Sequence, residues 1–166
     1  MRVAGAAIIG ALAIPMQAQA TTYVFTQAGY SAGATATGGF TGDDLNDDGI
    51  INSLEGEVSS FSLSFSGNSI VGAFSLDATS LIGLYYGPSA FSIITASVPQ
   101  FLLNSGPGGS CTPVCSVVIA PTGIDFAAQS PTVSAVPEAA TWALLITGFA
   151  AVGVALRRRS VVIRFA

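Results

Sequence analysis

Apolar and polar residues alternate along most of the chain between residues 21 and 126, and this period of two is typical of β-strands with one buried face. The clearest example is Glu57–Ser66, in which Phe and Leu alternate with serine. Turn residues such as Gly67-Asn68 and Gly87-Pro88 separate the stretches. Seven further stretches have strand character: Thr22–Thr26, Ile70–Leu76, Leu81–Tyr86, Ala90–Ala96, Phe101–Leu103, Ser116–Ala120 and Ile124–Phe126.

Short strands at this spacing predict a mainly β domain over residues 21–126, either a small antiparallel β-sandwich or a curled sheet. Two segments lack a clear pattern of burial. Ala28–Gly39 is rich in Gly, Ala and Thr and is either a loop or a weak edge strand. Residues 127–136 are rich in Ser, Pro and Ala, which predicts a linker that holds the domain away from the segment that follows.

The N-terminal end departs from the alternating pattern. Residues 1–20 begin with Arg2 as the only charge, continue with the apolar stretch Val3–Met16 and end in Ala18-Gln19-Ala20. This arrangement is typical of a secretory signal peptide, with cleavage expected after Ala20. The expected partners are the Sec translocon and signal peptidase. The alternative is a second membrane anchor, although the apolar run is short and is interrupted by Gly and Pro.

The C-terminal end departs in another way, because Ala139–Leu156 is an apolar run of 18 residues without a charge. A helix of this length extends about 27 Å, enough to cross the hydrocarbon core of a bilayer. Trp142 suits the outer interface, and the three arginines that follow should stay in the cytoplasm: Arg157, Arg158 and Arg159. The sequence therefore predicts a transmembrane helix over 139–156, with the preceding domain outside. The alternative is a buried core helix that ends in a basic turn.

Charge is distributed unevenly along the chain. The five basic residues all lie in the two end segments: Arg2, Arg157, Arg158, Arg159 and Arg164. Residues 21–136 contain no Lys, Arg or His, and their eight acids give a formal charge of −8: Asp43, Asp44, Asp47, Asp48, Glu55, Glu57, Asp77 and Asp125. Nucleic acid is excluded as a partner because no cation is present to displace its counterions. The expected partner of such a surface is a divalent cation.

Residues 44–55, DLNDDGIINSLE, have the spacing of an EF-hand calcium loop. Side-chain oxygens fall at positions 1, 3, 5, 9 and 12, and position 7 offers a backbone carbonyl: Asp44, Asn46, Asp48, Asn52, Glu55 and, for the carbonyl, Ile50. Ca²⁺ requires six to eight such oxygens. The Gly-rich segment before the loop differs from the helix of a true EF-hand, so the loop resembles the single calcium loops of dockerin-like extracellular modules. The alternative is an acidic loop that stays solvated.

Cys111 and Cys115 form the only pair of cysteines in the chain. In an exported protein a close pair predicts a local disulfide. Three residues separate the two cysteines, which excludes a C-x-x-C redox motif, and a metal site would lack further Cys or His ligands. The alternative is two free thiols.

The C-terminal segment resembles the PEP-CTERM sorting signal, in its variant with Trp and Ala. The matching residues are Pro137-Glu138, Trp142-Ala143, Gly148-Phe149, Gly153 and the arginines Arg157, Arg158 and Arg159. One position departs from the family pattern, because Ala139 replaces the second proline. The resemblance covers residues 137–159, and residues 160–166 are similar to the short cytoplasmic extension of such tails.

The resemblance implies a route of export. In this family an exosortase, an integral-membrane cysteine protease-transpeptidase, recognises the signal in Gram-negative bacteria that make exopolysaccharide. Cleavage near Pro137 would release the domain from its inner-membrane helix. The protein is then expected first at the inner membrane, facing the periplasm, and later at the cell surface or outside the cell.

Three classes of function remain at this point. The first is a structural or interaction protein of the cell surface or biofilm matrix, stabilised by Ca²⁺. The second is a module that binds exopolysaccharide, with Tyr85 and Tyr86 as sugar platforms. The third, an enzyme, is disfavoured because residues 21–136 lack His and Lys and the cysteines are expected to be paired. A carboxylate pair would have to draw on Asp77, Asp125 or the acidic loop. We therefore expect the first class and no enzymatic activity.

Overall fold

The chain is described by a computed structural model that covers residues 20–96, 98–106, 109–137 and 139–157. The predicted signal peptide, apart from Ala20, lies outside the described residues. The same is true of Glu138, Arg158, Arg159 and the predicted cytoplasmic tail 160–166.

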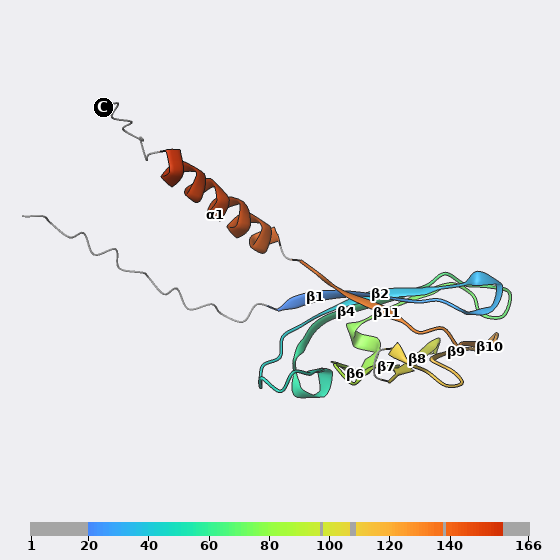
Figure 1. Cartoon of the computed structure of the whole chain (residues 1–166). Helices are drawn as coiled ribbons and strands as arrows, with labels where there is room; N and C mark the ends of the chain where they lie inside the picture. The colour runs from blue at the N-terminus through green and yellow to red at the C-terminus, as the bar shows by residue number, and fades with distance from the viewer. Residues whose placement is uncertain (1–19, 97, 107–108, 138, 158–166) are drawn as a thin grey trace, which may run out of the picture.

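The structure is a sandwich of two antiparallel sheets, followed by one helix (Figure 1). The first sheet has five strands in the order β11-β1-β2-β4-β5: Thr132–Val136, Thr21–Gln27, Ala36–Gly42, Val58–Phe65 and Phe74–Asp77. The second sheet has six strands in the order β10-β9-β8-β7-β6-β3: Gly123–Ala127, Ser116–Ala120, Gln100–Ser105, Ala90–Thr95, Leu81–Gly87 and Ile51–Asn52. Of the two predicted alternatives, the antiparallel sandwich is confirmed and the single curled sheet is not.

The remaining elements among the described residues are short 3₁₀ turns and one α-helix. Turn η1 spans Ser31–Gly33, η2 spans Ser53–Glu55, and η3 spans Ala78–Ser80. Helix α1 spans Ala139–Arg157 and projects away from the sandwich, beyond the end of β11 (Figure 1).

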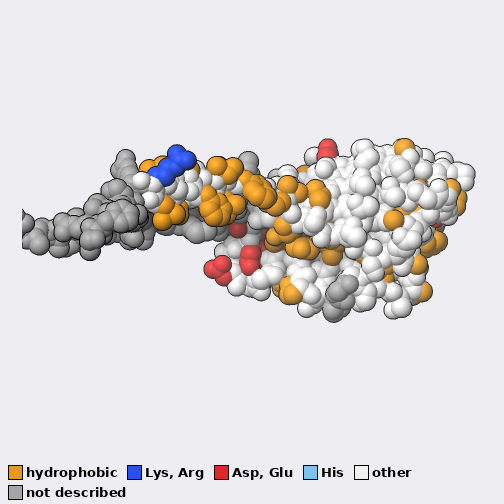
Figure 2. Space-filling model, turned by 45° about the horizontal axis from the view of Figure 1, so that its top comes forward, with side chains coloured by type: hydrophobic (Ala, Val, Ile, Leu, Met, Phe, Trp, Pro, Cys, Tyr) orange, Lys and Arg blue, Asp and Glu red, His pale blue; other side chains and the backbone are white. Residues whose placement is uncertain are grey.

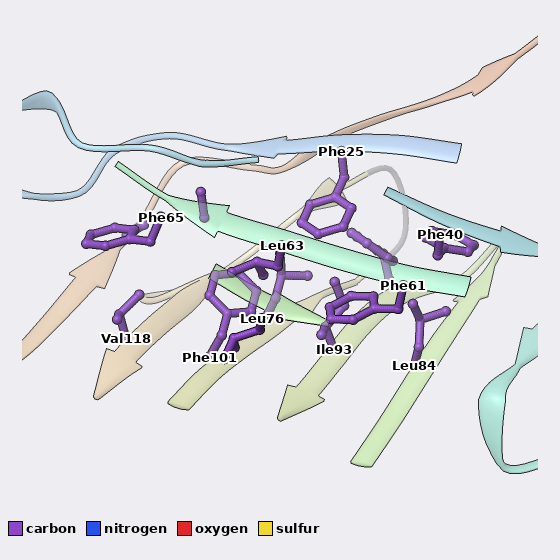
Figure 3. Close-up of a cluster of buried hydrophobic side chains, with 14 of the residues drawn as sticks. Phe25, Phe40, Phe61, Leu63, Phe65, Leu76, Leu84, Ile93, Phe101 and Val118 are labelled. Atoms are coloured by element: carbon purple, nitrogen blue, oxygen red, sulfur yellow. The ribbon is translucent and has the colours of Figure 1, made fainter. Parts of the chain in front are cut away.

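The core forms between the two sheets because the alternating pattern directs one set of side chains inward. In β4, Phe61, Leu63 and Phe65 are buried, whereas the serines between them are exposed. Figure 3 shows these side chains packed against residues of the second sheet, such as Ile93 and Phe101. Each fully buried large apolar side chain contributes about 1.5–3 kcal/mol, so this cluster is the main stabilising element of the sandwich.

The segment Ala28–Gly39, expected to be a loop or an edge strand, leads into an interior strand. Strand β2 lies between β1 and β4 and pairs with both along its length. Its glycines are required by the packing, because a Cβ on Gly38 would lie 2.5 Å from Cζ of Phe25 and 2.3 Å from the Ser62 carbonyl oxygen. The lack of side chains that weakened the strand pattern is therefore what allows Phe25 to lie across the strand.

The predicted linker 127–136 is wrong over its second half, where the chain forms strand β11. This strand pairs with β1 from Thr22 opposite Val136 to Thr26 opposite Thr132. The segment between β10 and β11 is also attached to the sandwich, because the Gln27 side-chain amide donates to the Gln129 carbonyl at 2.7 Å. Two residues, at positions 137 and 138, separate β11 from α1. The sandwich is therefore connected directly to the helix.

Most predicted strands differ from the observed ones by only one or two residues in total, but two others differ by more. The stretch predicted to begin at Ile70 becomes a strand only at Phe74, since the Asn68 side chain accepts from the N–H groups of Ile70 and Val71, at 2.9 Å each, and holds a turn there. The predicted strand Phe101–Leu103 extends in both directions and becomes β8.

This correction predicts that strand β11 is needed for stability. A chain that ends at Val136 should melt at the temperature of the full sandwich, whereas one that ends at Ser130 should melt about 10 °C lower. The shorter chain loses the burial of Pro131 and the packing of Val133 against the core, together roughly 3 kcal/mol. Thermal unfolding of both fragments by circular dichroism would test this, and equal melting temperatures would contradict it.

Candidate functional site

The acidic loop lies at the end of the sandwich from which the C-terminal helix leaves. It connects β2 in the first sheet with β3 in the second. Gly42, at the end of β2, pairs with Thr21 at the start of β1, and Thr22 pairs with Val136 at the end of β11. Figure 2 accordingly shows acidic side chains next to the start of the apolar helix. The predicted calcium loop and the predicted membrane segment are therefore neighbours.

Inside the loop, the first three predicted ligands turn their oxygens toward the backbone. Asp44 accepts from the N–H of Asp48 at 3.0 Å and from the N–H of Gly49 at 2.7 Å. Asn46 Oδ1 accepts from the same Asp48 N–H at 3.0 Å, and Asp48 Oδ1 accepts from the N–H of Ile50 at 2.8 Å. Asp47 and Gly49 have φ values of 58° and 80°, which give the loop its tight curl. Oxygens from positions 1, 3 and 5 thus lie on the inside of the curl.

The last two predicted side-chain ligands, Asn52 and Glu55, are joined to the loop by hydrogen bonds. Asn52 caps turn η2 by accepting from the Leu54 N–H at 3.1 Å, and this turn carries Glu55 back toward the loop. The Glu55 carboxylate accepts from the side-chain amides of Asn46 at 2.7 Å and Asn52 at 2.9 Å. The structure therefore brings together positions 3, 9 and 12, which are far apart in an extended chain.

The carboxylate of Glu57, which the sequence analysis did not select, is buried and hydrogen-bonds to the backbone of the loop. Glu57 is 3% exposed, and its two oxygens accept from the N–H groups of Leu45 and Asn52, each at 2.9 Å. It thereby joins the beginning of the loop to its end. The sequence contained one indication: no base between residues 21 and 136 is available to pair with a buried acid, so backbone N–H groups must hold it.

Within the part of the chain that the structure describes, no three His, Cys, Asp or Glu residues are grouped so that they could hold a metal ion. The predicted ligand set therefore depends on Asn46 and Asn52 as well as on the acids. The side-chain amides of both asparagines donate to Glu55, while their oxygens accept from the N–H groups of Asp48 and Leu54. Carboxylate and amide oxygens are the hard donors that Ca²⁺ prefers.

The predicted disulfide is present between Cys111 and Cys115, whose Cα atoms are 5.1 Å apart. Cys115 is buried, and its N–H donates to the Ala127 carbonyl at 2.8 Å. Its carbonyl accepts from the Asn104 N–H, also at 2.8 Å. The small disulfide loop is therefore fixed to both β8 and β10.

Helix α1 presents large apolar side chains that the sandwich does not cover. Those that the structure describes are 51–74% exposed: Trp142, Leu144, Leu145, Ile146, Phe149, Val152, Val154 and Leu156. Arg157 is the last residue of the helix. Among the described residues, no helix is both long enough and apolar enough to cross a membrane. The transmembrane span over 139–156 thus stays a prediction.

The tyrosines expected to form a sugar platform have separate positions. Tyr86 packs in the aromatic cluster between the sheets, with ring centroids 4.7 Å from Tyr23, 5.6 Å from Phe40 and 5.8 Å from Phe91. Tyr85, next in the strand, points to the other side of the second sheet. The two rings therefore cannot present one flat surface to a sugar.

The two remaining acids are engaged in local structure. Asp77 caps turn η3, and hydrogen bonds from the hydroxyl and N–H of Thr79 lower the pKa of its carboxyl. Asp125 is 3% exposed and accepts from the Ser31 hydroxyl at 2.9 Å, the Asn68 amide at 2.5 Å and the Phe126 N–H at 2.9 Å. Burial alone would raise the pKa of the Asp125 carboxyl, but these hydrogen bonds outweigh burial and lower it. Asp125 thus ties together three segments of the chain.

No protein-family model, no curated protein and no solved structure matches this chain.

Proposed function

We propose that this chain is an exported structural or interaction protein of the cell surface or exopolysaccharide matrix, sorted by an exosortase. In this proposal a calcium-stabilised β-sandwich is delivered on a C-terminal membrane helix. The observation that carries the proposal is the position of α1, whose apolar side chains are exposed directly after the last strand of the sandwich. A helix whose apolar surface the sandwich leaves uncovered requires another apolar environment, which a bilayer provides.

The charges support the orientation of this tether. Arg157 is at the end of α1 distant from the sandwich, and two further arginines follow it in the sequence. Cationic residues beside a membrane helix stay in the cytoplasm, so the sandwich would face the periplasm. The resemblance to PEP-CTERM tails then supplies the exosortase as a partner, with cleavage near Pro137.

The loop geometry supports one structural Ca²⁺ site. Its ligands would be the side-chain oxygens of Asp44, Asn46, Asp48, Asn52 and Glu55 together with the Ile50 carbonyl. Bound there, the ion would neutralise neighbouring acids that otherwise repel one another. Because the loop runs from one sheet to the other, binding would stabilise the connection between the two halves of the sandwich.

A second candidate function is binding of a neutral polysaccharide, and the outer face of the first sheet favours it. A shallow groove of about 500 Å³ crosses this face, lined partly by the hydroxyl-bearing residues Thr26, Thr37, Ser62, Ser64 and Ser75. Hydroxyl groups of this kind can donate to and accept from sugar hydroxyls. Binding of the purified sandwich to a glycan array would support this candidate.

Membrane partition tests the proposal. The full chain, expressed in a Gram-negative host, should sediment with the membranes and resist extraction with carbonate. A chain that ends at Val136 retains every strand and should be recovered in the soluble periplasmic fraction. Extraction of the full chain by carbonate, or recovery of either chain from the cytoplasm, would contradict the proposal.

A further inference from the structure

The outer face of the second sheet carries a continuous row of apolar residues. Phe126 in β10 pairs with Val117 in β9, Val117 with Leu102 in β8, and Leu102 with Ile94 in β7. Beside this row, Ile124 pairs with Ile119. Phe126 and Ile124 are 53% and 50% exposed, and Ile94 is 39% exposed. We call these six residues the apolar face.

The first sheet shows what the outer surface of this sandwich otherwise looks like. Many of its outward positions carry hydroxyl groups, as in the row formed by Thr26, Thr37 and Ser64. A sheet with one face in water normally alternates in this way. The apolar face departs from that pattern over four neighbouring strands. Contiguous exposed apolar surface of this kind marks an interaction site.

The apolar face is not flat, because it contains a groove. A groove of about 300 Å³ opens on it, between the outward residues of β7, β8 and β9 and the disulfide loop. Its lining includes Ile94, Leu102, Val117 and, from the disulfide loop, Val114. Because the Cys111–Cys115 bridge and the hydrogen bonds of Cys115 fix this loop, the rim of the groove is held in place. The face is therefore preorganised for contact.

Charge indicates what kind of partner fits. None of the six residues is charged, and the acids of the sandwich lie elsewhere. Glu57 and Asp125 are buried, Asp77 is in the first sheet, and the others belong to the acidic loop or η2. The loop leads into β3, at the opposite edge of the second sheet from β10. Two copies of the chain would repel each other at the acidic end but not at the apolar face.

We propose that the apolar face is the interface of a symmetric homodimer, with a second copy of this chain as the partner. A two-fold axis brings the same surface of both copies together, so an uncharged face meets an uncharged face. A charged partner would have to leave its charges unpaired against this surface, which costs free energy. An axis parallel to the strands also leaves both α1 helices at the same end. The proposal does not depend on the membrane tether, because it rests on the sheet alone.

Sedimentation velocity of the full chain in a mild non-ionic detergent tests the proposal. The wild type should sediment as a dimer at tens of micromolar. The double variant Ile94→Asp/Phe126→Asp places four carboxylates across the interface and should raise the dimer dissociation constant at least about tenfold. Val24→Asp is the matched control, because Val24 is 44% exposed on the outer face of the other sheet, and it should stay dimeric.

A cross-linking measurement keeps the test decisive if the double variant does not fold. In liposomes, Leu102→Cys, which lies in the middle of the row, should form an intermolecular disulfide under mild oxidation, and Ser62→Cys on the first sheet should not. A wild type that is monomeric at every concentration would overturn the proposal. A folded double variant that dimerises like the wild type, or equal cross-linking of the two cysteine variants, would overturn it as well.

Discussion

Addition of 10 mM Ca²⁺ to the metal-free sandwich is expected to raise its melting temperature by about 10 °C. Exported calcium loops have dissociation constants on the order of 10⁻⁴ M, so this concentration stabilises the folded state by about 2.7 kcal/mol. The effect is large because the unfolded chain cannot gather positions 3, 9 and 12, which the structure brings together at Glu55. Differential scanning calorimetry with and without Ca²⁺ measures the shift.

Variants separate calcium binding from a general effect of acidic residues. Glu55→Gln removes the carboxylate at position 12 and should abolish the calcium-dependent shift. Asp77→Asn changes an exposed acid in the first sheet and should leave the shift unchanged. A sample verified as metal-free that shows no shift at 10 mM would refute the calcium site, as would a Glu55→Gln variant that responds like the wild type.

The second large effect is expected for Asp125→Ala, which should destabilise the sandwich by about 3–5 kcal/mol. The variant removes a buried carboxylate and leaves the N–H groups of Ser31 and Phe126 and the amide of Asn68 without their acceptor at a partly buried site. Urea unfolding followed by fluorescence or circular dichroism measures the loss. Asp77→Asn serves again as the control and should lower stability by less than about 1 kcal/mol. If Asp125→Ala lowers stability by no more than Asp77→Asn does, the result would contradict a stabilising role for the hydrogen bonds of Asp125.

The same carboxylate predicts how stability responds to acid. The hydrogen bonds lower the pKa of Asp125 in the folded state, so its contribution is complete above the unfolded value of about 3.9. The contribution is lost as the pH falls through the lower, folded pKa. Asp125→Asn should therefore lose less stability than the wild type between pH 5 and pH 2. Parallel pH profiles of unfolding free energy for the two proteins would contradict this prediction.

The sequence was sufficient for the fold wherever side chains alternate. Glu57–Ser66 was predicted as a strand because Phe61, Leu63 and Phe65 face one side, and β4 is buried on that side. For strand β2 the sequence left a loop or a weak edge strand open, because its glycines, which leave space for Phe25, interrupt the alternating pattern. Strand β11 was missed for a different reason. It is an edge strand with largely exposed side chains, so its attachment to β1 depends on backbone hydrogen bonds.

The candidate site, like the fold, was predicted from the sequence only in part. The spacing of residues 44–55 was enough to select the side chains that gather around Glu55. Glu57 was not selected, because its role depends on tertiary burial under the loop. The network of Asp125 joins residues 31, 68 and 125, and such distant contacts leave no trace in local spacing. The linker prediction failed for the same reason, since β11 pairs with β1, which is more than 100 residues earlier in the chain.

The direct connection between β11 and α1 bears on the sorting hypothesis. Pro137 follows the last residue of an edge strand and is itself exposed. The segment proposed for cleavage therefore lies at the rim of the sandwich, beside the start of β1 and the acidic loop. Any protease acting there must approach the folded sandwich closely.

The most direct test of the proposed function is the location of the sandwich in two isogenic Gram-negative hosts, one with an exosortase and one without. Cell fractions would be probed with an antibody to the sandwich, and intact mass would define its C-terminus. The account predicts sandwich at the surface or in the medium, ending near Pro137, in the first host, and full-length membrane-bound chain facing the periplasm in the second. Sandwich in the cytoplasm, or the same distribution in both hosts, would contradict it.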